Sequence, residues 1–177
     1  GMTYFYGSKF KKEDKKRGRL MVEASASSGF PMAVAYCHYR GWNGVKKDSK
    51  RAFDMSAKIE KETNGYHWAQ YLLGYCYRQG HGTDQDHTKA FEWWTKSSER
   101  ENSLAMCWLG ICYEKGQGCD QNRTKALESY EKSAHLGSSS AMYNLGKCYE
   151  QGDGVTKDLN KAREWYTKSA AQGNKSC

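Results

Sequence analysis

Residues 141–173 read AMYNLGKCYEQGDGVTKDLNKAREWYTKSAAQG, and two closely related stretches precede them. The segment Leu145-Gly146-Lys147-Cys148-Tyr149 recurs at residues 109–113 and 73–77, at intervals of 36 residues. A Gly-x-Gly triplet and a Lys-Ala pair follow each copy at the same distances. Self-similarity at such a period is typical of solenoid proteins, so this repeat determines the fold class.

The repeat predicts a pair of helices. In the last copy, Ala141, Leu145, Cys148 and Tyr149 fall at i, i+4, i+7 and i+8, which form one face of a helix. The Gly-x-Gly triplet ends that helix. The N-cap of a second amphipathic helix then holds Asp48, Asp86, Asn122 and Asp158 in successive copies. Because one helical pair cannot bury its apolar face alone, we expect an all-α protein, a right-handed α-solenoid superhelix of stacked helix-turn-helix units.

The repeats divide the chain into units of a single domain, residues 1–177. A partial unit, residues 1–29, precedes four repeats at residues 30–66, 67–102, 103–138 and 139–177. A glycine lies inside the first helix of three repeats, as Gly74, Gly110 and Gly146. Glycine there costs about 0.5–1 kcal/mol relative to alanine, so its lack of a side chain predicts close approach of the paired helix.

The first repeat departs from this pattern. Tyr36 falls at the position of the glycine inside the helix, and Trp42 falls where the first loop glycine is expected. In the partial unit, Gly18 takes the place of the alanine of the Lys-Ala pair. These departures predict altered geometry in the first 45 residues.

The repeats resemble those of the Sel1-like repeat family, a relative of the tetratricopeptide repeats. Fifteen residues of the last copy match the family pattern: Ala141, Leu145, Gly146, Tyr149, Gly152, Gly154, Val155, Asp158, Lys161, Ala162, Trp165, Tyr166, Lys168, Ala170 and Gly173. Members are mostly adaptors that hold protein complexes together, so the resemblance implies a non-catalytic scaffold or adaptor that binds a protein or peptide. Two alternatives stay open: a structural segment of a longer solenoid protein, and a hydrolase resembling the cysteine-rich members.

Three of the seven cysteines share one repeat position, Cys76, Cys112 and Cys148. Packed helix axes lie about 8–10 Å apart, whereas a disulfide needs Cα atoms within about 7 Å. We therefore interpret these cysteines as buried apolar filling. The resemblance adds that secreted cysteine-rich members join the two helices of a unit by a disulfide, but the matching second-helix positions here are Ser98, Ala134 and Ala170. This difference and the odd cysteine count favour a reducing, cytoplasmic location.

No catalytic, metal or cofactor site is predicted. The spacings of Cys107, Cys112 and Cys119 do not form the paired knuckles of structural zinc sites. Ser129 and Lys132 match the Ser-x-x-Lys motif of penicillin-binding enzymes, but the accompanying Ser-Asp-Asn and Lys-Thr-Gly motifs do not occur. Ser129 instead occupies a repeat position that holds tryptophan in two other copies, so we interpret the match as chance.

The chain is basic, with 28 Lys and Arg against 20 Asp and Glu and a net charge of +8. Seven basic residues cluster near the N-terminus: Lys9, Lys11, Lys12, Lys15, Lys16, Arg17 and Arg19. We interpret them as a solvated end of the solenoid, because no aromatic-plus-basic nucleic-acid module accompanies them. A nucleic acid is therefore not expected as a partner. A membrane is not expected either, because no stretch approaches the ~20 apolar residues of a membrane span.

The first helix of each unit lines the concave surface in tetratricopeptide-like stacks, and a partner is expected there. The predicted contact residues are Arg40, Tyr71, Tyr75, Arg78, Ile111, Glu114, Tyr143, Lys147 and Glu150. The three tyrosines are the expected anchors. Arg40 and Arg78 are predicted to share a repeat position with Glu114 and Glu150, so that the groove runs from basic to acidic and orients its ligand. The alternative is a solvated helix surface with no partner.

Overall fold

The computed structural model describes residues 12–174, and every regular element in that range is a helix. The prediction of an all-α repeat solenoid is confirmed. Residues 1–11 of the predicted partial unit, with Lys9 and Lys11, lie outside the described residues. The helices are α2 (Lys12–Ser27), α3 (Pro31–Arg40), α4 (Ser49–Thr63), α5 (His67–Gln79), α6 (His87–Ser98), α7 (Ser103–Lys115), α8 (Arg123–His135), α9 (Ser139–Gln151) and α10 (Leu159–Ala171).

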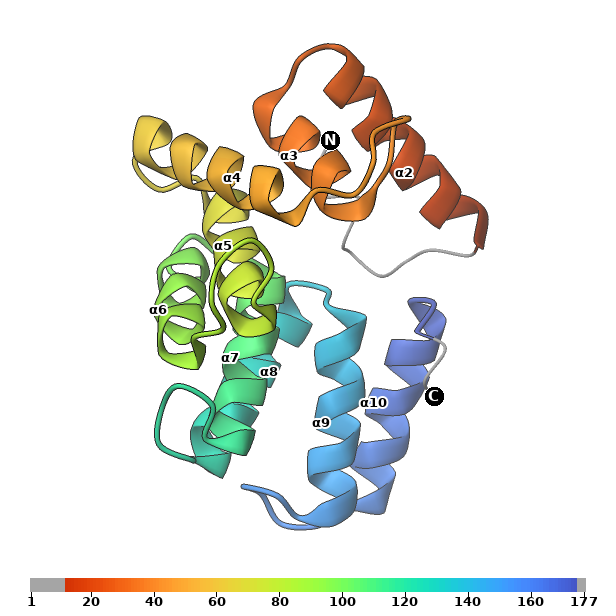
Figure 1. Cartoon of the computed structure of the whole chain (residues 1–177). Helices are drawn as coiled ribbons and strands as arrows, with labels where there is room; N and C mark the ends of the chain where they lie inside the picture. The colour runs from red at the N-terminus through yellow and green to blue at the C-terminus, as the bar shows by residue number, and fades with distance from the viewer. Residues whose placement is uncertain (1–11, 175–177) are drawn as a thin grey trace.

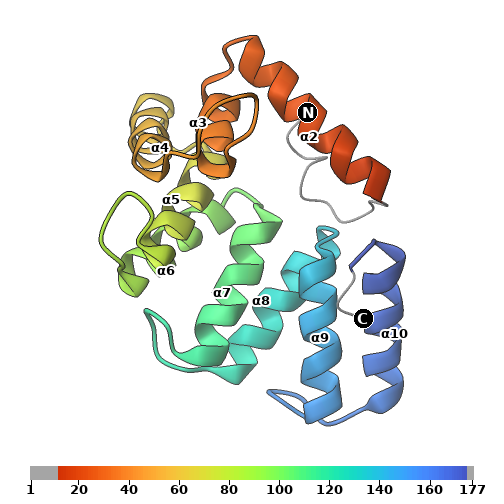
Figure 2. The same cartoon turned by 45° about the vertical axis from the view of Figure 1, so that its right-hand side comes forward.

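The helices pack mainly against their neighbours in the sequence. Each repeat is one pair (α3 with α4, α5 with α6, α7 with α8, α9 with α10), and the second helix of a pair packs on the first helix of the next. The pairs follow one another along an arc, with α2 near one end and α9 and α10 at the other (Figures 1 and 2). The core is accordingly a series of clusters between adjacent helices. None of the described helices is long and apolar enough to cross a membrane.

Both predicted kinds of helix end are present. Gly80, Gly116 and Gly152 end the first helices of their repeats in the left-handed conformation. The side chains of Asp48, Asp86, Asn122 and Asp158 accept hydrogen bonds from backbone N–H groups in the first turn of α4, α6, α8 and α10. These contacts fix where each helix starts and stops.

The backbone corrects the predicted register of the first repeat. The N–H of Gly41 donates to the carbonyl of Cys37, as the N–H of Gly80 donates to the carbonyl of Cys76. Gly41 is therefore the first loop glycine, and the expectation that Trp42 replaces it is wrong. Cys37 joins the cysteine position of the other repeats.

The same register places Ala35, and not Tyr36, at the position of the glycine inside the first helix. Tyr36 corresponds to Tyr75, and Tyr39 corresponds to Arg78, so the predicted pairing of Arg40 with Arg78 is also wrong. The reason is the length of the loop that follows the helix. The loop after α3 is one residue longer than the next one, so counting back from the aspartate cap misplaces the helix by one residue.

The glycine inside each first helix makes room for a ring of the second helix, as predicted. A Cβ atom on Gly110 would overlap the Tyr130 ring, and one on Gly74 would lie 2.6 Å from the Trp94 indole. In the first repeat the corresponding residues are Ala35 and Ser56, and both are fully buried. An alanine is thus found where the opposing residue is small.

Two further contacts recur from repeat to repeat. The buried hydroxyls of Ser97, Ser133 and Ser169 donate to main-chain carbonyls at the start of the first helix, at 2.6–2.7 Å. The second loop glycine packs against the preceding repeat: a Cβ on Gly118 would overlap the carbonyl oxygen of His87. The serine contact joins the helices within a repeat, and the glycine contact joins successive repeats.

We predict that Gly110→Ala lowers the free energy of unfolding by about 1–3 kcal/mol, because the new methyl group overlaps the buried Tyr130 ring. In a Tyr130→Ser background, which copies the Ala35 and Ser56 pair, the same substitution should be neutral or stabilising. Urea denaturation of the four proteins of this double-mutant cycle measures the coupling. Equal effects of Gly110→Ala in both backgrounds would contradict the contact.

The contact of Gly118 with the preceding repeat predicts that alanine destabilises this loop more than the loop of the first repeat. Gly118 and Gly44 both have positive φ values, of 78° and 73°, but a Cβ on Gly44 would meet nothing within 4 Å. Gly118→Ala should therefore destabilise by about 1–3 kcal/mol more than Gly44→Ala, since only the former adds a clash to the backbone strain. Thermal unfolding of the two variants checks this, and similar losses would mean that Gly118 serves only its own turn.

Candidate protein-binding surface

A row of aromatic side chains crosses the first repeats. It consists of Trp42, Tyr36, Tyr39, Tyr75 and Trp108. Ring centroids of successive members lie 5.6 Å (Trp42 to Tyr36), 5.7 Å (Tyr36 to Tyr39), 5.4 Å (Tyr39 to Tyr75) and 6.0 Å (Tyr75 to Trp108) apart. The row continues into the core through Trp108, which stacks on the buried Trp94 at 5.1 Å.

Three arginines lie on the two ends of this row. The guanidinium groups of Arg19 and Arg40 lie 5.2 and 5.1 Å from the Trp42 ring, and that of Arg78 lies 4.5 Å from the Trp108 ring. Such contacts hold a cation over the face of an aromatic ring. Tyr36 is only 7% exposed and belongs to a core cluster, so it joins Trp42 to Tyr39 from beneath. We call Trp42, Tyr39, Tyr75, Trp108 and the three arginines the arginine-aromatic surface.

The charges at one repeat position differ along the arc. Arg78 has no carboxylate partner within salt-bridge distance among the described residues, and its buried Nε atom has no hydrogen-bond partner. Glu114 and Glu150, at the corresponding positions, accept hydrogen bonds from the hydroxyls of Tyr130 and Tyr166. Burial and then the bond to Glu114 raise the pKa of Tyr130 above its ordinary value, so this hydroxyl stays protonated and donating.

His81 lies beside the middle of the row. Its ring centroid is 6.3 Å from that of Tyr39 and 6.2 Å from that of Tyr75. Burial, and then the charge of Lys47, lower the pKa of His81, and its buried Nδ1 atom has no hydrogen-bond partner. A neutral imidazole with a free nitrogen therefore accompanies the unpaired guanidinium.

The structure places the nine predicted contact residues unequally. Arg40 and Tyr75 are members of the arginine-aromatic surface, together with Arg78. Tyr71 is only 8% exposed and packs in the core with Trp94, so its prediction as an outward anchor is wrong. The side chain of Tyr71 points into the contact between repeats because the next repeat covers that face of α5.

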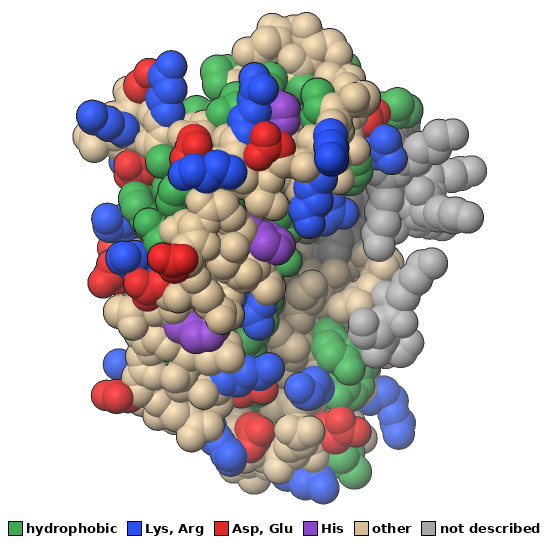
Figure 3. Space-filling model, viewed as in Figure 1, with side chains coloured by type: hydrophobic (Ala, Val, Ile, Leu, Met, Phe, Trp, Pro, Cys, Tyr) green, Lys and Arg blue, Asp and Glu red, His purple; other side chains and the backbone are tan. Residues whose placement is uncertain are grey.

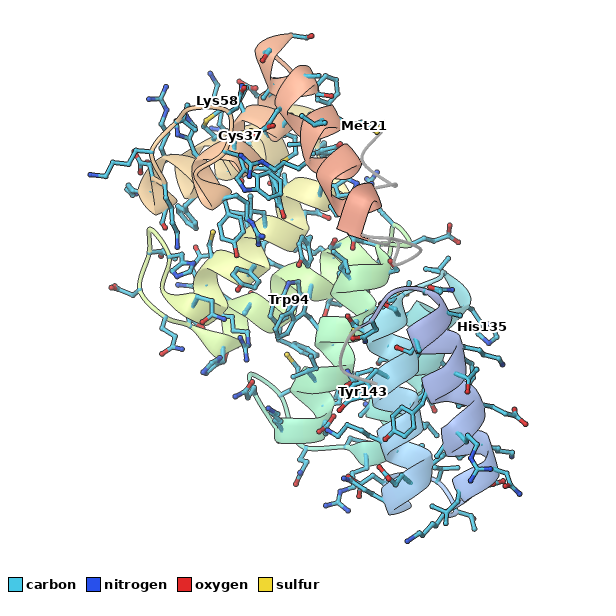
Figure 4. The ribbon with its side chains drawn as sticks, turned by 90° about the vertical axis from the view of Figure 1, so that its right-hand side faces the viewer. Met21, Cys37, Lys58, Trp94, His135 and Tyr143 are labelled. Carbon is cyan, nitrogen blue, oxygen red and sulfur yellow. The ribbon has the colours of Figure 1, made fainter. Side chains whose placement is uncertain are left out.

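The remaining predicted residues lie farther along the arc. Ile111 is half-buried against the cluster shared by the last two repeats. Tyr143 lies on α9 beside α10, with its ring 5.5 Å from that of Tyr166 (Figure 4). Lys147 is half-buried and Glu150 is exposed. The nine predicted residues therefore do not form one cluster, and only Arg40, Tyr75 and Arg78 lie on the aromatic row.

Sequence reasoning missed several members of this surface: Tyr39, Trp42, Trp108 and Arg19. The one-residue error in register left Tyr39 without a role. A clearer signal was available in the three aromatic residues of the segment Tyr36 to Trp42, which no other repeat matches at those positions.

The Sel1 repeat family model matches the chain at residues 32–58, 69–102, 103–138 and 139–174. The chain belongs to the Sel1 repeat family. Sel1 repeat proteins are generally non-catalytic and bind protein partners.

Solved Sel1 repeat structures resemble this one. A protective antigen of uropathogenic Escherichia coli with an SLR fold has a TM-score of 0.72 at 32% identity, over 88% of this chain and 33% of that chain. A Sel1 repeat protein of Oxalobacter formigenes has a TM-score of 0.68 at 27% identity, over 89% and 65%. The chain thus spans about a third and about two thirds of the lengths of these proteins. Cysteine rich protein B of Helicobacter pylori shares the fold, with a TM-score of 0.57 at 22% identity. No curated protein matches the chain significantly.

The described cysteines of this Sel1 repeat protein are free thiols, and all except Cys119 are buried. Burial raises the pKa of Cys76, Cys107 and Cys112 to about 12. The interpretation of Cys76, Cys112 and Cys148 as buried apolar filling is confirmed, because all three are buried in core clusters. No group of three or more His, Cys, Asp or Glu side chains within residues 12–174 is placed to hold a metal ion.

The Ser-x-x-Lys match gains no support from the geometry. The hydroxyl of Ser129 donates to the backbone carbonyl of Lys125 at 2.7 Å, one turn earlier in the same helix. Its proton is therefore engaged with the backbone of α8 in this structure.

We predict that iodoacetamide modifies Cys119 faster than Cys76, Cys107 and Cys112, by about tenfold or more, because only thiolates react and burial suppresses them. Peptide mass spectrometry after timed quenching measures each rate, with urea-unfolded protein as the control in which the rates converge. A Cys76 that reacts as fast as Cys119 in the native protein would contradict the burial argument.

The raised pKa values of Cys76, Cys107 and Cys112 also predict how stability depends on pH. Since these three pKa values lie above the ordinary 9.0, the protonated thiols favour folding below pH 9, and that stability falls as the pH rises toward 12.

Proposed function

We propose that this Sel1 repeat protein is a non-catalytic interaction scaffold that binds an acidic segment of a partner protein across the arginine-aromatic surface. The observation that carries the proposal is the unpaired state of Arg78 on Trp108. A guanidinium that is held against a ring and lacks a carboxylate is suited to pair with a carboxylate of a ligand.

The aromatic row supports the same proposal. Tyr75 is half-buried between Tyr39 and Trp108, so its orientation is fixed before a ligand arrives. Rigid tyrosine, tryptophan and arginine side chains are the residues that most often dominate binding energy at interfaces. Little conformational entropy would be lost by these side chains on binding.

The distribution of charge gives the ligand a direction. The face of the molecule seen in Figure 3 is hollowed, and Lys and Arg side chains border this hollow. Glu114 and Glu150, farther along the arc, already accept tyrosine hydroxyls and are less available to basic groups of a ligand. The acidic part of the segment should therefore lie over α3 and α5.

A second candidate function, a structural unit within a longer solenoid, is favoured by one observation. Leu20 and Met21 of α2, and Phe30 after it, are 54%, 43% and 55% exposed. End surfaces of solenoids are normally polar, so an apolar end is suited to stacking against another helical unit. This role is compatible with the proposed binding surface, because Leu20, Met21 and Phe30 do not belong to it.

The test is selection from a random peptide library on the folded protein, followed by affinity measurement. We expect enrichment of Asp and Glu beside apolar residues, and weakening of the selected peptide by about 10–100-fold in Arg40→Glu/Arg78→Glu. The matched control is Lys58→Glu/Lys61→Glu on the exposed side of α4, which changes the net charge equally. It should leave the affinity within about twofold at physiological salt.

Circular dichroism of both variants checks that they keep their helix content. A photo-crosslinking residue in place of Tyr75 should then couple to the selected peptide in the wild-type background only. The proposal is contradicted if both charge variants weaken binding alike, or if selection returns no acidic preference.

A further inference from the structure

A pocket of about 430 Å³ lies between α6, α7 and α8, and it shares no residue with the arginine-aromatic surface. Its apolar floor is formed by Met106, Leu109 and Tyr113 of α7. Ser129 and Lys132 of α8 line its side. This volume falls within the range of small-ligand and side-chain pockets.

The repeat pattern explains why the pocket exists. Ser129 stands three residues after Ala126, where the second and fourth repeats have Trp93 and Trp165. Trp165 packs against the core cluster that contains Met142 and Leu145, which are the counterparts of Met106 and Leu109. The third repeat therefore lacks the indole that covers the corresponding apolar residues in the fourth.

Burial of the floor follows the same difference. Met142 and Leu145 are 6% and 0% exposed in the cluster against which Trp165 packs. In the third repeat, Leu109 stays buried at 8% exposed, but Met106 is only half-buried. Met106 is thus less covered than its counterpart Met142, and it is the part of the floor that the pocket exposes.

A lysine accompanies each of the two tryptophans. The Nζ atom of Lys96 lies 4.4 Å from the ring centroid of Trp93, and that of Lys168 lies 4.3 Å from that of Trp165. Lys132 is the corresponding residue of the third repeat, and it lines the pocket where the ring is missing. The site therefore combines an apolar floor with a cation placed to cover an inserted ring.

We propose that this pocket binds an aromatic side chain, best a tryptophan, of a partner polypeptide. The inserted indole completes the repeat: it covers Met106 and Leu109 as Trp165 covers their counterparts, and Lys132 lies over its outer face. The polar groups around the pocket, which include Ser129 and Lys125, favour an aromatic residue carried on a peptide backbone over a wholly apolar ligand.

The test uses the blocked peptide acetyl-Gly-Trp-Gly-amide as the probe, with acetyl-Gly-Leu-Gly-amide as its control. We expect the tryptophan peptide to shift the methyl signals of Met106 and Leu109 in NMR spectra, with an affinity on the order of tenfold above that of the leucine peptide. Lys132→Ala should weaken the tryptophan peptide several-fold, by about the value of one cation–π contact.

The Ser129→Trp variant supplies the missing ring within the chain. We expect it to move the Met106 and Leu109 signals as the peptide does, to raise the melting temperature and to abolish peptide binding. Ser140→Trp, at an exposed position on α9, adds the same side chain elsewhere and should leave binding unchanged. If Ser129→Trp does not fold, Ser129→Leu provides a smaller block of the same pocket.

Three results would overturn the proposal. One is that saturating tryptophan peptide leaves both methyl signals unmoved. Another is that the peptide binds equally well after Ser129 is replaced by a large residue. The third is that free indole binds as tightly as the peptide, which would identify the ligand as a small aromatic molecule and not a polypeptide.

Discussion

The close crossing of the two helices in a repeat is the contact on which the rest of the structure depends. A ring from the second helix lies against the main chain of the first, and only a glycine there leaves space for it. The buried serine at the end of the second helix then reaches a carbonyl at the start of the first, which fixes the other end of the pair. With both ends of the crossing fixed, the outward faces of the pair are set, and the second helix packs on the first helix of the next pair.

Contacts between repeats are consequently local, and each repeat can vary without disturbing distant ones. The first repeat shows how far this variation extends. It replaces glycine and an aromatic residue by Ala35 and Ser56, and it shortens its first helix, yet its caps and its packing on α5 persist. In a globular core, a change of this size would affect residues on every side. In a solenoid it affects mainly the adjacent pairs.

The fold could be predicted from the sequence because its determinants recur at a fixed spacing. The glycines, the N-cap residues and the alanine of each second helix recur at the same positions of the repeat, so they can be recognised in the sequence. The candidate surface was only partly predictable, because it depends on how one helix is rotated against its neighbours. A single residue turns a helix by about 100°, so the misplaced register moved Tyr39 off the surface that it helps to form. The prediction for Tyr71 was wrong for a different reason. Its burial depends on packing against the following repeat, and the pattern within its own helix does not show that packing.

Departures from the repeat, more than its regular positions, carry the information about partners. Tyr149 and Trp165 follow the pattern because they complete the packing of the repeat. At the position of Arg78, by contrast, the chain has tyrosine, arginine and then two glutamates. The first two belong to an aromatic surface with an unpaired cation, whereas both glutamates accept tyrosine hydroxyls within the repeat. Ser129 is a departure of the opposite kind, since it removes a side chain and opens the core. The arginine that replaces a glutamate and the serine that replaces a tryptophan are therefore the two departures on which the proposed binding sites rest, and each determines the chemistry of the proposed ligand.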